Sequence, residues 1–264
     1  MDDSAILLNW PGGKRSLLKQ ILPLVPENCS RYYEPFIGGG ALFFTLKPAL
    51  AVLSDKNAEL MNCYQQIRDY PNAVISYLSR MKNTKEDYYR IRENLPEENV
   101  ARAARIIYLM ALSFNGIYRV NLQGKFNVPY GDNKNLIIYD ADKIHAASAA
   151  LASADIRVGD FKDAVTDADA GDFVYLDPPY TVMHNNNGFV KYNDHIFSWE
   201  DQERLAMVAK ELIERGCKVV ISNADHPSIE NLYLGFYKQK ITRSSTISAS
   251  TKFRREITEC LFYC

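Results

Sequence analysis

The chain carries Asp177-Pro178-Pro179-Tyr180 directly after the apolar run Phe173-Val174-Tyr175-Leu176. The apolar run predicts a short buried strand. Because proline cannot continue a central strand, the strand is expected to end here and to present its polar groups at one edge of a sheet. In an open α/β sheet, ligands bind at the carboxyl ends of the strands. A carboxylate, backbone carbonyl oxygens and a tyrosine ring at that edge would suit a planar group that bears an amine.

A glycine-rich turn near the N-terminus lies between a strand and a helix. Tyr32-Tyr33-Glu34 is the strand candidate, Gly38-Gly39-Gly40 forms the turn, and residues 41–46 are helical in pattern. The next strand, 51–54, ends in Asp55, and an acid at this place commonly takes the ribose hydroxyls of a nucleoside. The spacing is not Gly-x-Gly-x-x-Gly, so a dinucleotide fingerprint is not satisfied. The order of turn, helix, strand and acid predicts a nucleoside-containing cofactor.

Trp10-Pro11-Gly12-Gly13-Lys14 precedes a helical pattern in which Leu17, Leu18, Ile21 and Leu22 share one face. A lysine at a helix N-terminus beside glycines can hold a carboxylate or a phosphate. The spacing differs from that of the phosphate-binding loop, and these residues alone favour a plain turn.

The remaining elements follow from periodicity and from turn residues. Residues 57 to about 112 have helical periodicity, and Ser198-Trp199-Glu200-Asp201 is a capping-box pattern that starts another helix. Further strands are expected at 155–158, which leads to Gly159-Asp160-Phe161, and at 218–222, 234–241 and 257–263. We expect a mobile loop at 181–197 and a basic Ser/Thr-rich loop at 242–255.

Composition narrows the class of protein. The 264 residues are 47% hydrophobic and 24% charged, with a net charge of −1, so the chain can bury a sizeable core. No apolar run reaches the roughly 20 residues of a membrane span, and the acidic N-terminus lacks the basic start of a secretory signal. The five scattered cysteines contain no Cys-x-x-Cys pair, so neither a zinc site nor a disulfide framework is expected. A cytoplasmic protein fits best.

Two stretches are basic although the whole chain is not. Residues 101–131 contain four basic side chains and no acid, and residues 238–255 contain six and no acid. Ordinary solvated faces explain this charge equally well.

Residues 114–131 are also rich in Asn, Gly and aromatic side chains. Arg and Asn can contact the edges of guanine and adenine, and an exposed aromatic ring can wedge between bases. A hairpin packed on the domain is the plainer alternative.

Together these motifs resemble those of the Dam family of DNA adenine methyltransferases (the D12 class, with alpha-type motif order). The resemblance runs from Trp10 to the C-terminus and rests on Trp10–Lys14, Glu34-Pro35-Phe36, Ser54-Asp55, 115–131, Asp177–Tyr180, Asp201-Gln202 and Ser222-Asn223. It implies an α/β, Rossmann-like methyltransferase fold with a mixed, mostly parallel sheet and helices on both faces. It also implies a discontinuous catalytic domain, 1–56 and 141–264, and an inserted, mainly helical target-recognition subdomain with a β-hairpin, 57–140.

The resemblance implies S-adenosylmethionine as cofactor. Matched by position, its pocket comprises Trp10, Lys14, Phe36, Gly38, Asp55, Asp160 and Asp177. Lys14 would lie near the methionine end, Asp55 at the ribose and Asp160 near the adenine. The expected contacts to double-stranded DNA are Asn9, Phe114, Asn115, Ile117, Arg119, Asn121, Pro129, Lys134 and Arg254.

Within the DNA contacts, Phe114 matches an intercalating aromatic residue and Arg119 a guanine-reading arginine. The chain departs from the family pattern at two positions. Asn9 stands where the family often has lysine, and Asp132 stands where it often has a basic residue. Recognition of an outer base is therefore expected to be looser or different, and phosphate binding is expected to be weaker or to shift to Lys134 and to the 238–255 stretch.

The implied reaction is methyl transfer to the exocyclic 6-amino group of adenine after base flipping, at GATC or a related site. Asp177 and the Pro178 carbonyl would accept the amine hydrogens, and Tyr180 would stack on the base. Alternatives are an amino-methyltransferase acting on cytosine, RNA or protein glutamine, and a catalytically silent DNA-binding protein. No metal and no membrane partner are expected. The oligomeric state is expected to be monomeric or weakly dimeric. A cognate restriction endonuclease, a phage context or independent action all remain open.

Overall fold

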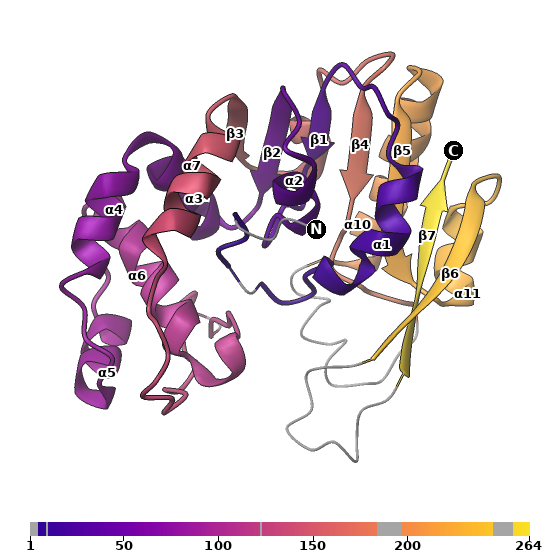
Figure 1. The fold of residues 1–264 in the computed structure, drawn as a ribbon. Helices are drawn as coiled ribbons and strands as arrows, with labels where there is room; N and C mark the ends of the chain where they lie inside the picture. Colours follow the sequence, from indigo (N-terminus) through magenta and orange to yellow (C-terminus); the bar gives the residue numbers. More distant parts are fainter. Residues whose placement is uncertain (1–4, 9, 122, 184–196, 245–255) are drawn as a thin grey trace. The chain divides into compact units, whose positions relative to one another are not determined.

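The computed structural model of the protein describes residues 5–8, 10–121, 123–183, 197–244 and 256–264 (Figure 1). Its sheet has the strand order β3-β2-β1-β4-β5-β7-β6. The strands are β1 (Tyr32–Glu34), β2 (Ala51–Asp55), β3 (Ala154–Val158), β4 (Phe173–Leu176), β5 (Lys218–Ala224), β6 (Tyr237–Ser244) and β7 (Glu256–Tyr263). β1 is parallel to β2 and β4, and β4 is parallel to β5, whereas β7 is antiparallel to β5 and β6. The predicted mixed, mostly parallel sheet is confirmed.

The order of the strands determines where the polar strand ends gather. The chain leaves β1 for β2 on one side and later enters β4 on the other side, so the topological switch point lies between β1 and β4. The carboxyl ends of these two strands lead to Glu34 and Asp177. All four residues of β4 are buried, as expected for a parallel strand that is covered on both faces. The Asp177–Tyr180 motif therefore lies at the edge where ligands of such sheets bind.

The chain divides into two compact units, which we describe separately. The first comprises Met1–Gly13, Ile37–Lys47 and Asp55–Gly159, and the second comprises Lys14–Phe36, Pro48–Ser54 and Asp160–Cys264. The domain boundaries expected from the family resemblance stay a prediction.

The first unit is mainly helical. Its helices are α2 (Ala41–Leu46), α3 (Ala58–Asp69), α4 (Pro71–Leu78), α5 (Lys85–Glu93), α6 (Asn99–Leu112) and α7 (Ala141–Leu151), with the 3-10 turn η3 (Phe114–Gly116). Side-chain N-caps begin three of them, because Asn57, Thr84 and Asp140 each accept a backbone N–H of the first turn. α6 packs on α3 and α4, and small residues such as Ala103 and Ala104 allow the close approach.

The second unit contains α1 (Leu18–Ile21) between the 3-10 turns η1 (Arg15–Leu17) and η2 (Leu22–Leu24), then α8 (Phe161–Ala164), α10 (Trp199–Glu214) and α11 (Pro227–Leu232). The predicted capping box at Ser198 and Asp201 is confirmed. The apolar stripe of α10, which includes Leu205, Val208 and Leu212, is buried with residues of β4 and β5 in one core. Burial of each such side chain contributes about 1.5–3 kcal/mol. Figure 1 draws α1 and α10 on opposite sides of the sheet.

The C-terminal strands differ from their predicted limits. β6 begins at Tyr237 rather than 234, because Gly235 has a φ of +95° and ends the preceding turn. The pairing of β6 with β7 then continues to Ser244 and Glu256, into the expected 242–255 loop. Residues 245–255 of that loop, and residues 184–196 of the expected mobile loop, lie outside the described residues.

The 114–131 stretch is irregular rather than a regular ladder. Two isolated antiparallel bridges close it, Ser113 with Tyr130 and Val120 with Phe126. Within the part of the chain that the structure describes, none of the helices combines the length and the apolar character needed to cross a membrane.

Candidate active site

Lys14 and Asp177, which come from distant parts of the sequence, form an ion pair in the second unit. Lys14 Nζ lies 2.8 Å from Asp177 Oδ1, and the two side chains are only 6% and 16% exposed. The abrupt end of β4 at two prolines positions Asp177, and the turn before η1 positions Lys14. An ion pair with so little solvent around it interacts more strongly than one at the surface.

Tyr180 is fixed in orientation by a buried acid, Glu259 of β7. The Tyr180 hydroxyl donates to Glu259 Oε2 at 2.6 Å, and Lys14 Nζ lies 4.8 Å from the centroid of the Tyr180 ring. Lys14 Nζ is also 3.9 Å from Glu259. Burial raises the pKa of Tyr180 well above its usual range, and the nearby charges of Asp177 and Glu259 raise it further. Tyr180 is therefore a neutral phenol that donates a hydrogen bond.

A chain of two buried amides supports the Asp177–Tyr180 motif. Gln202, in the first turn of α10, donates from Nε2 to the Pro179 carbonyl at 3.2 Å. Asn223 of β5 donates from Nδ2 to Gln202 Oε1 at 2.9 Å. Both side chains are fully buried. The two amides connect β5, α10 and the motif. This contact is a structural reason for the presence of Gln202 and Asn223 among the residues that match the family pattern.

Phe36 and Asp160 are brought to one corner of the second unit. The Phe36 and Phe161 rings stack with centroids 5.4 Å apart. Asp160 begins α8 by accepting the Lys162 N–H at 3.0 Å, and its carboxylate pairs with Arg204 at 2.7 and 3.2 Å. The Arg204 guanidinium also lies 4.6 Å from the centroid of the Phe161 ring. In the structure, the acid expected near the cofactor adenine caps α8 and pairs with Arg204.

The first unit brings Trp10, Gly38 and Asp55 together. Asp55 accepts the Gly38 N–H at 3.2 Å on Oδ2 and the Asn57 N–H at 2.9 Å on Oδ1. Gly38 has a φ of +47°, and a Cβ there would lie 2.8 Å from Trp10 Cδ1, so the turn requires glycine. Burial raises the pKa of Asp55, while backbone hydrogen bonds from Asn57, Gly38 and Lys56 oppose the rise.

The expected base-reading residues are displayed along the irregular 114–131 stretch. Phe114 is 47% exposed, although its backbone N–H is held by the Pro129 carbonyl at 2.9 Å. Asn115 is exposed in a left-handed conformation, with a φ of +57°. Arg119 is exposed and donates from Nε to Asn127 Oδ1 at 2.8 Å. Ile117 is half-buried.

The other expected DNA contacts are less uniform. Pro129 and Lys134 are exposed. Asn121 Oδ1 accepts the N–H groups of Gln123 and Lys125, each at 3.0 Å, so this side chain closes a turn. Asn9 and Arg254 lie outside the described residues.

Part of the basic charge is paired with groups of the protein itself. Arg102 pairs with Glu59, and Arg105 donates to the carbonyl oxygens of Ile91 and Arg92 at 2.9 and 2.6 Å. Lys238 pairs with Glu230, and Lys240 lies 2.5 Å from Asp225. The hydrogen bond from Lys240 is the main cause that lowers the pKa of Asp225 to about 2. These four cations have structural partners.

Sequence reasoning missed Glu259 and Arg204 as parts of these clusters. The available signal for Glu259 was an acid directly before the apolar run Cys260-Leu261-Phe262 of a predicted strand. Arg204 gave no comparable signal, because a charged residue on an amphipathic helix is ordinary.

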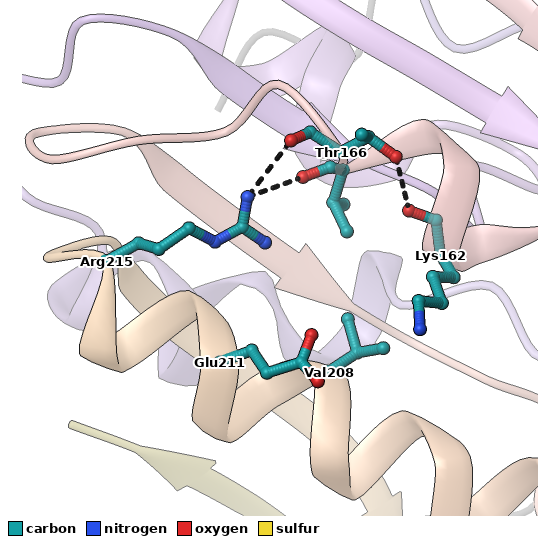
Figure 2. A pocket seen from close by; sticks show the side chains of 6 residues that line it. Lys162, Thr166, Val208, Glu211 and Arg215 are labelled. Atoms are coloured by element: carbon teal, nitrogen blue, oxygen red, sulfur yellow. Dashed lines mark hydrogen bonds between the residues drawn. The ribbon is translucent and has the colours of Figure 1, made fainter.

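A separate depression in the second unit holds none of the expected site residues. It is lined by Lys162, Val165, Thr166, Val208, Glu211 and Arg215 (Figure 2). Arg215 donates to the carbonyl oxygens of Thr166 and Ala168 at 3.0 and 2.9 Å, so it closes the turn after α8. Among the described residues, no group of three or more His, Cys, Asp or Glu side chains is arranged to hold a metal ion.

The strand order, with β7 reversed beside β5, and the Asp-Pro-Pro-Tyr motif at the end of β4 define a Rossmann-like methyltransferase. Comparison with known proteins gives the family. The model of the D12 class N6 adenine-specific DNA methyltransferases matches residues 10–248. The chain belongs to this family, and it is therefore an adenine-specific DNA methyltransferase that depends on S-adenosylmethionine.

Named relatives span nearly the whole chain. The Type II methyltransferase M1.LlaDCHI of Lactococcus lactis subsp. cremoris is 44% identical over 262 residues, which cover 96% of this chain and 92% of the relative. The Type II methyltransferase M.MjaIII of Methanocaldococcus jannaschii is 34% identical and covers 94% of each chain. The DNA adenine methylase of Escherichia coli K12 is 31% identical, over 99% of this chain and 95% of the relative.

Proposed function

We propose that this methyltransferase acts on the exocyclic 6-amino group of adenine in double-stranded DNA, after flipping the base, at GATC or a related site. The observation that carries the proposal is the Asp177–Tyr180 motif, with its carboxylate paired to Lys14 and its tyrosine oriented by Glu259. The names of the relatives from L. lactis and M. jannaschii support a place beside a restriction endonuclease.

The residues present fit S-adenosylmethionine, which supplies a methyl group bound to a positively charged sulfur. In the first unit, the Gly38 turn provides a backbone without a side chain, and Asp55 provides a carboxylate for ribose hydroxyls. In the second unit, Lys14 offers a cation to a carboxylate, and Phe36 and Asp160 offer a ring and an acceptor suited to a purine. Trp10 lines the Gly38 turn.

The chain's own residues would activate a weak nucleophile. The amine of adenine is poorly nucleophilic because its lone pair is delocalised into the ring. The Asp177 carboxylate and the Pro178 carbonyl would each accept one amine hydrogen, which favours a tetrahedral nitrogen with a directed lone pair. Tyr180 would stack on the flipped base. The Gln202 contact to the neighbouring Pro179 carbonyl supports this geometry before the substrate arrives.

Recognition of the site would come from the first unit. Arg119 would contact guanine in the major groove, because its guanidinium can donate twice to O6 and N7. Phe114 would fill the gap that the flipped base leaves, since its ring is already exposed. The expectation of GATC rests on the match of Arg119–Asn121 and Phe126–Gly131 to the family pattern.

The test is to express the chain in a host that lacks DNA methylation and to map modified bases by single-molecule sequencing. We expect N6-methyladenine within GATC or a site that shares its central bases. The Asp177→Ala variant should leave the DNA unmodified while the purified protein still binds a duplex. Near-normal methylation by Asp177→Ala would overturn the mechanism. Methyl groups found on cytosine, RNA or protein instead of adenine would overturn the proposed substrate.

A further inference from the structure

We propose that Tyr118 is a positioning residue that couples cofactor binding to DNA binding. This inference rests on the proposed function, and it concerns the first unit alone. We call residues 114–131 the recognition loop. Tyr118 lies in that loop beside Arg119, yet its ring packs on a residue of the expected cofactor pocket.

Trp10 and Tyr118 form a stacked aromatic pair. Their ring centroids are 4.4 Å apart, with an interplanar angle of 23°. Trp10 also packs on the glycine turn, where no side chain could fit between Gly38 and the indole. Trp10 therefore joins the recognition loop to the turn that is expected to face the cofactor. Offset stacks of this kind contribute about 0.5–1.5 kcal/mol beyond the area they bury.

A second path joins the same two places through polar contacts. Gly38 donates its N–H to Asp55 at 3.2 Å, and Asp55 accepts the N–H of Asn57 at 2.9 Å. The Asn57 side chain interacts with Tyr118 and opposes the rise that burial causes in the pKa of this tyrosine. Trp10, Gly38, Asp55, Asn57 and Tyr118 thus form a closed ring of contacts. A group linked by two routes is harder to displace than one held by a single contact.

On its other side, Tyr118 is tied to the base-reading part of the recognition loop. Its ring meets Phe126 edge to face, with centroids 5.7 Å apart, and Phe126 is buried. Arg119 follows Tyr118 in the sequence and Asn127 follows Phe126, and these two residues are hydrogen-bonded to each other. Asn127 donates its N–H to the Arg119 carbonyl at 3.1 Å, and Arg119 donates from Nε to Asn127 at 2.8 Å. The placement of Tyr118 therefore sets the placement of Arg119.

These contacts have a thermodynamic consequence. A ligand that orders Trp10, Gly38 or Asp55 also orders Tyr118, so DNA then binds to a loop that has already lost part of its conformational freedom. By linkage, DNA must improve cofactor binding by the same factor. Couplings of this type commonly amount to about 5- to 150-fold in affinity. We expect a value near the lower end, about tenfold, because one stack and one polar contact carry it.

The experiment measures the coupling rather than either affinity alone. The dissociation constant of a fluorescent GATC duplex is determined by anisotropy, with and without saturating S-adenosylhomocysteine, and the ratio is compared among variants. Tyr118→Leu removes the stack and should reduce the ratio from about 10 toward 1. Tyr118→Phe keeps the stack and should retain most of the ratio. The matched control is Tyr89→Leu on α5, whose ring contacts Tyr88 and Arg92 instead.

A second variant keeps the inference testable if Tyr118→Leu fails to fold. Asn57→Ser preserves a capping side chain for α3 but is too short to reach Tyr118, so it should lower the ratio in part. A ratio in Tyr118→Leu and Asn57→Ser equal to that of the wild type would overturn the inference, as would a wild-type ratio of 1. Failure of the proposed function is distinguishable, because the wild type would then not methylate adenine at all.

Discussion

Glu259 shows how one residue can shape a site without belonging to its motif. A carboxylate buried among apolar neighbours is costly unless charged or hydrogen-bonding partners offset the loss of water. Here Lys14 approaches it to 3.9 Å and the Tyr180 hydroxyl donates to it at 2.6 Å. The acid therefore orients the ring that is proposed to stack on the flipped adenine.

Replacing this carboxylate by an amide tests its role. Glu259→Gln keeps the shape but weakens the hydrogen bond to Tyr180, because bonds to charged groups contribute about 1.5–3 kcal/mol and neutral ones about half as much. We expect the rate of methyl transfer in a single turnover to fall about tenfold, while the affinity for duplex DNA changes by less than about threefold.

The matched control for this change is Glu230→Gln, which alters a partly exposed partner of Lys238. Its single-turnover rate should stay at the wild-type value. If Glu259→Gln turned over as fast as Glu230→Gln, the orientation of Tyr180 by Glu259 would not matter for catalysis.

The contrast between Asp177 and Glu259 shows what sequence can predict about such a site. Asp177, Pro178 and Tyr180 lie within four consecutive residues, so their chemistry can be predicted from the sequence. Glu259 lies 79 residues from Tyr180, and only the pairing of β7 with β5 brings it near. Arg204 is similar, because its pairing with Asp160 depends on how α10 packs on α8.

At the scale of elements, α10 connects the sheet to the Asp177–Tyr180 motif. Gln202 follows the confirmed capping box, so the cap determines where the helix begins and thus where this amide points. The amide then lies between Asn223 of β5 and the carbonyl of Pro179. A polar chain inside the protein contributes to a unique geometry only if all its members are paired.

Breaking this chain should affect both stability and activity. Gln202→Leu would leave the Asn223 amide and the Pro179 carbonyl without their partner in a buried place. We expect the free energy of unfolding to fall by about 2–3 kcal/mol, measured by urea denaturation. Methylation at a temperature where the variant is folded should fall as well, since the motif loses its support.

Lys210→Leu is the control for Gln202→Leu, because Lys210 lies on the exposed face of the same helix. It should change the free energy of unfolding by less than about 0.5 kcal/mol. Equal stability of the two variants would show that the amide chain does not support the motif.

Elements with strong local signals were predicted within a residue or two, and the others were not. The limits of β4 and α2 match the prediction because prolines, glycines and apolar runs determine them. The limits of β6 depend instead on its pairing with β7, which no local pattern encodes. The recognition loop is closed by two isolated bridges, so neither helical nor strand periodicity describes it.

For the whole molecule, the distribution of charge matters more than its sum. The net charge is −1, so the chain as a whole does not attract DNA. In the structure, the basic side chains of the stretch 101–131 are of two kinds, those paired within the protein and those exposed to solvent. Arg102 and Arg105 have partners inside the first unit, whereas Lys125 is exposed. Binding to phosphates should therefore depend on fewer cations than the sequence suggests.

The salt dependence of DNA binding tests this division. Each phosphate contact contributes about 0.9 to the slope of log Kd against log salt concentration. Lys125→Gln and Lys134→Gln should each lower that slope by about 0.9, because Lys125 is exposed within the recognition loop and Lys134 is exposed just after it. Arg105→Gln should leave the slope unchanged but lower the free energy of unfolding by about 1–3 kcal/mol, since it removes the donor to two carbonyl oxygens at the end of α5. The slopes are measured by anisotropy titrations of duplex DNA at salt concentrations between about 50 and 200 mM. A lower slope in Arg105→Gln, or an unchanged slope in both lysine variants, would contradict the assignment of structural and DNA-facing cations.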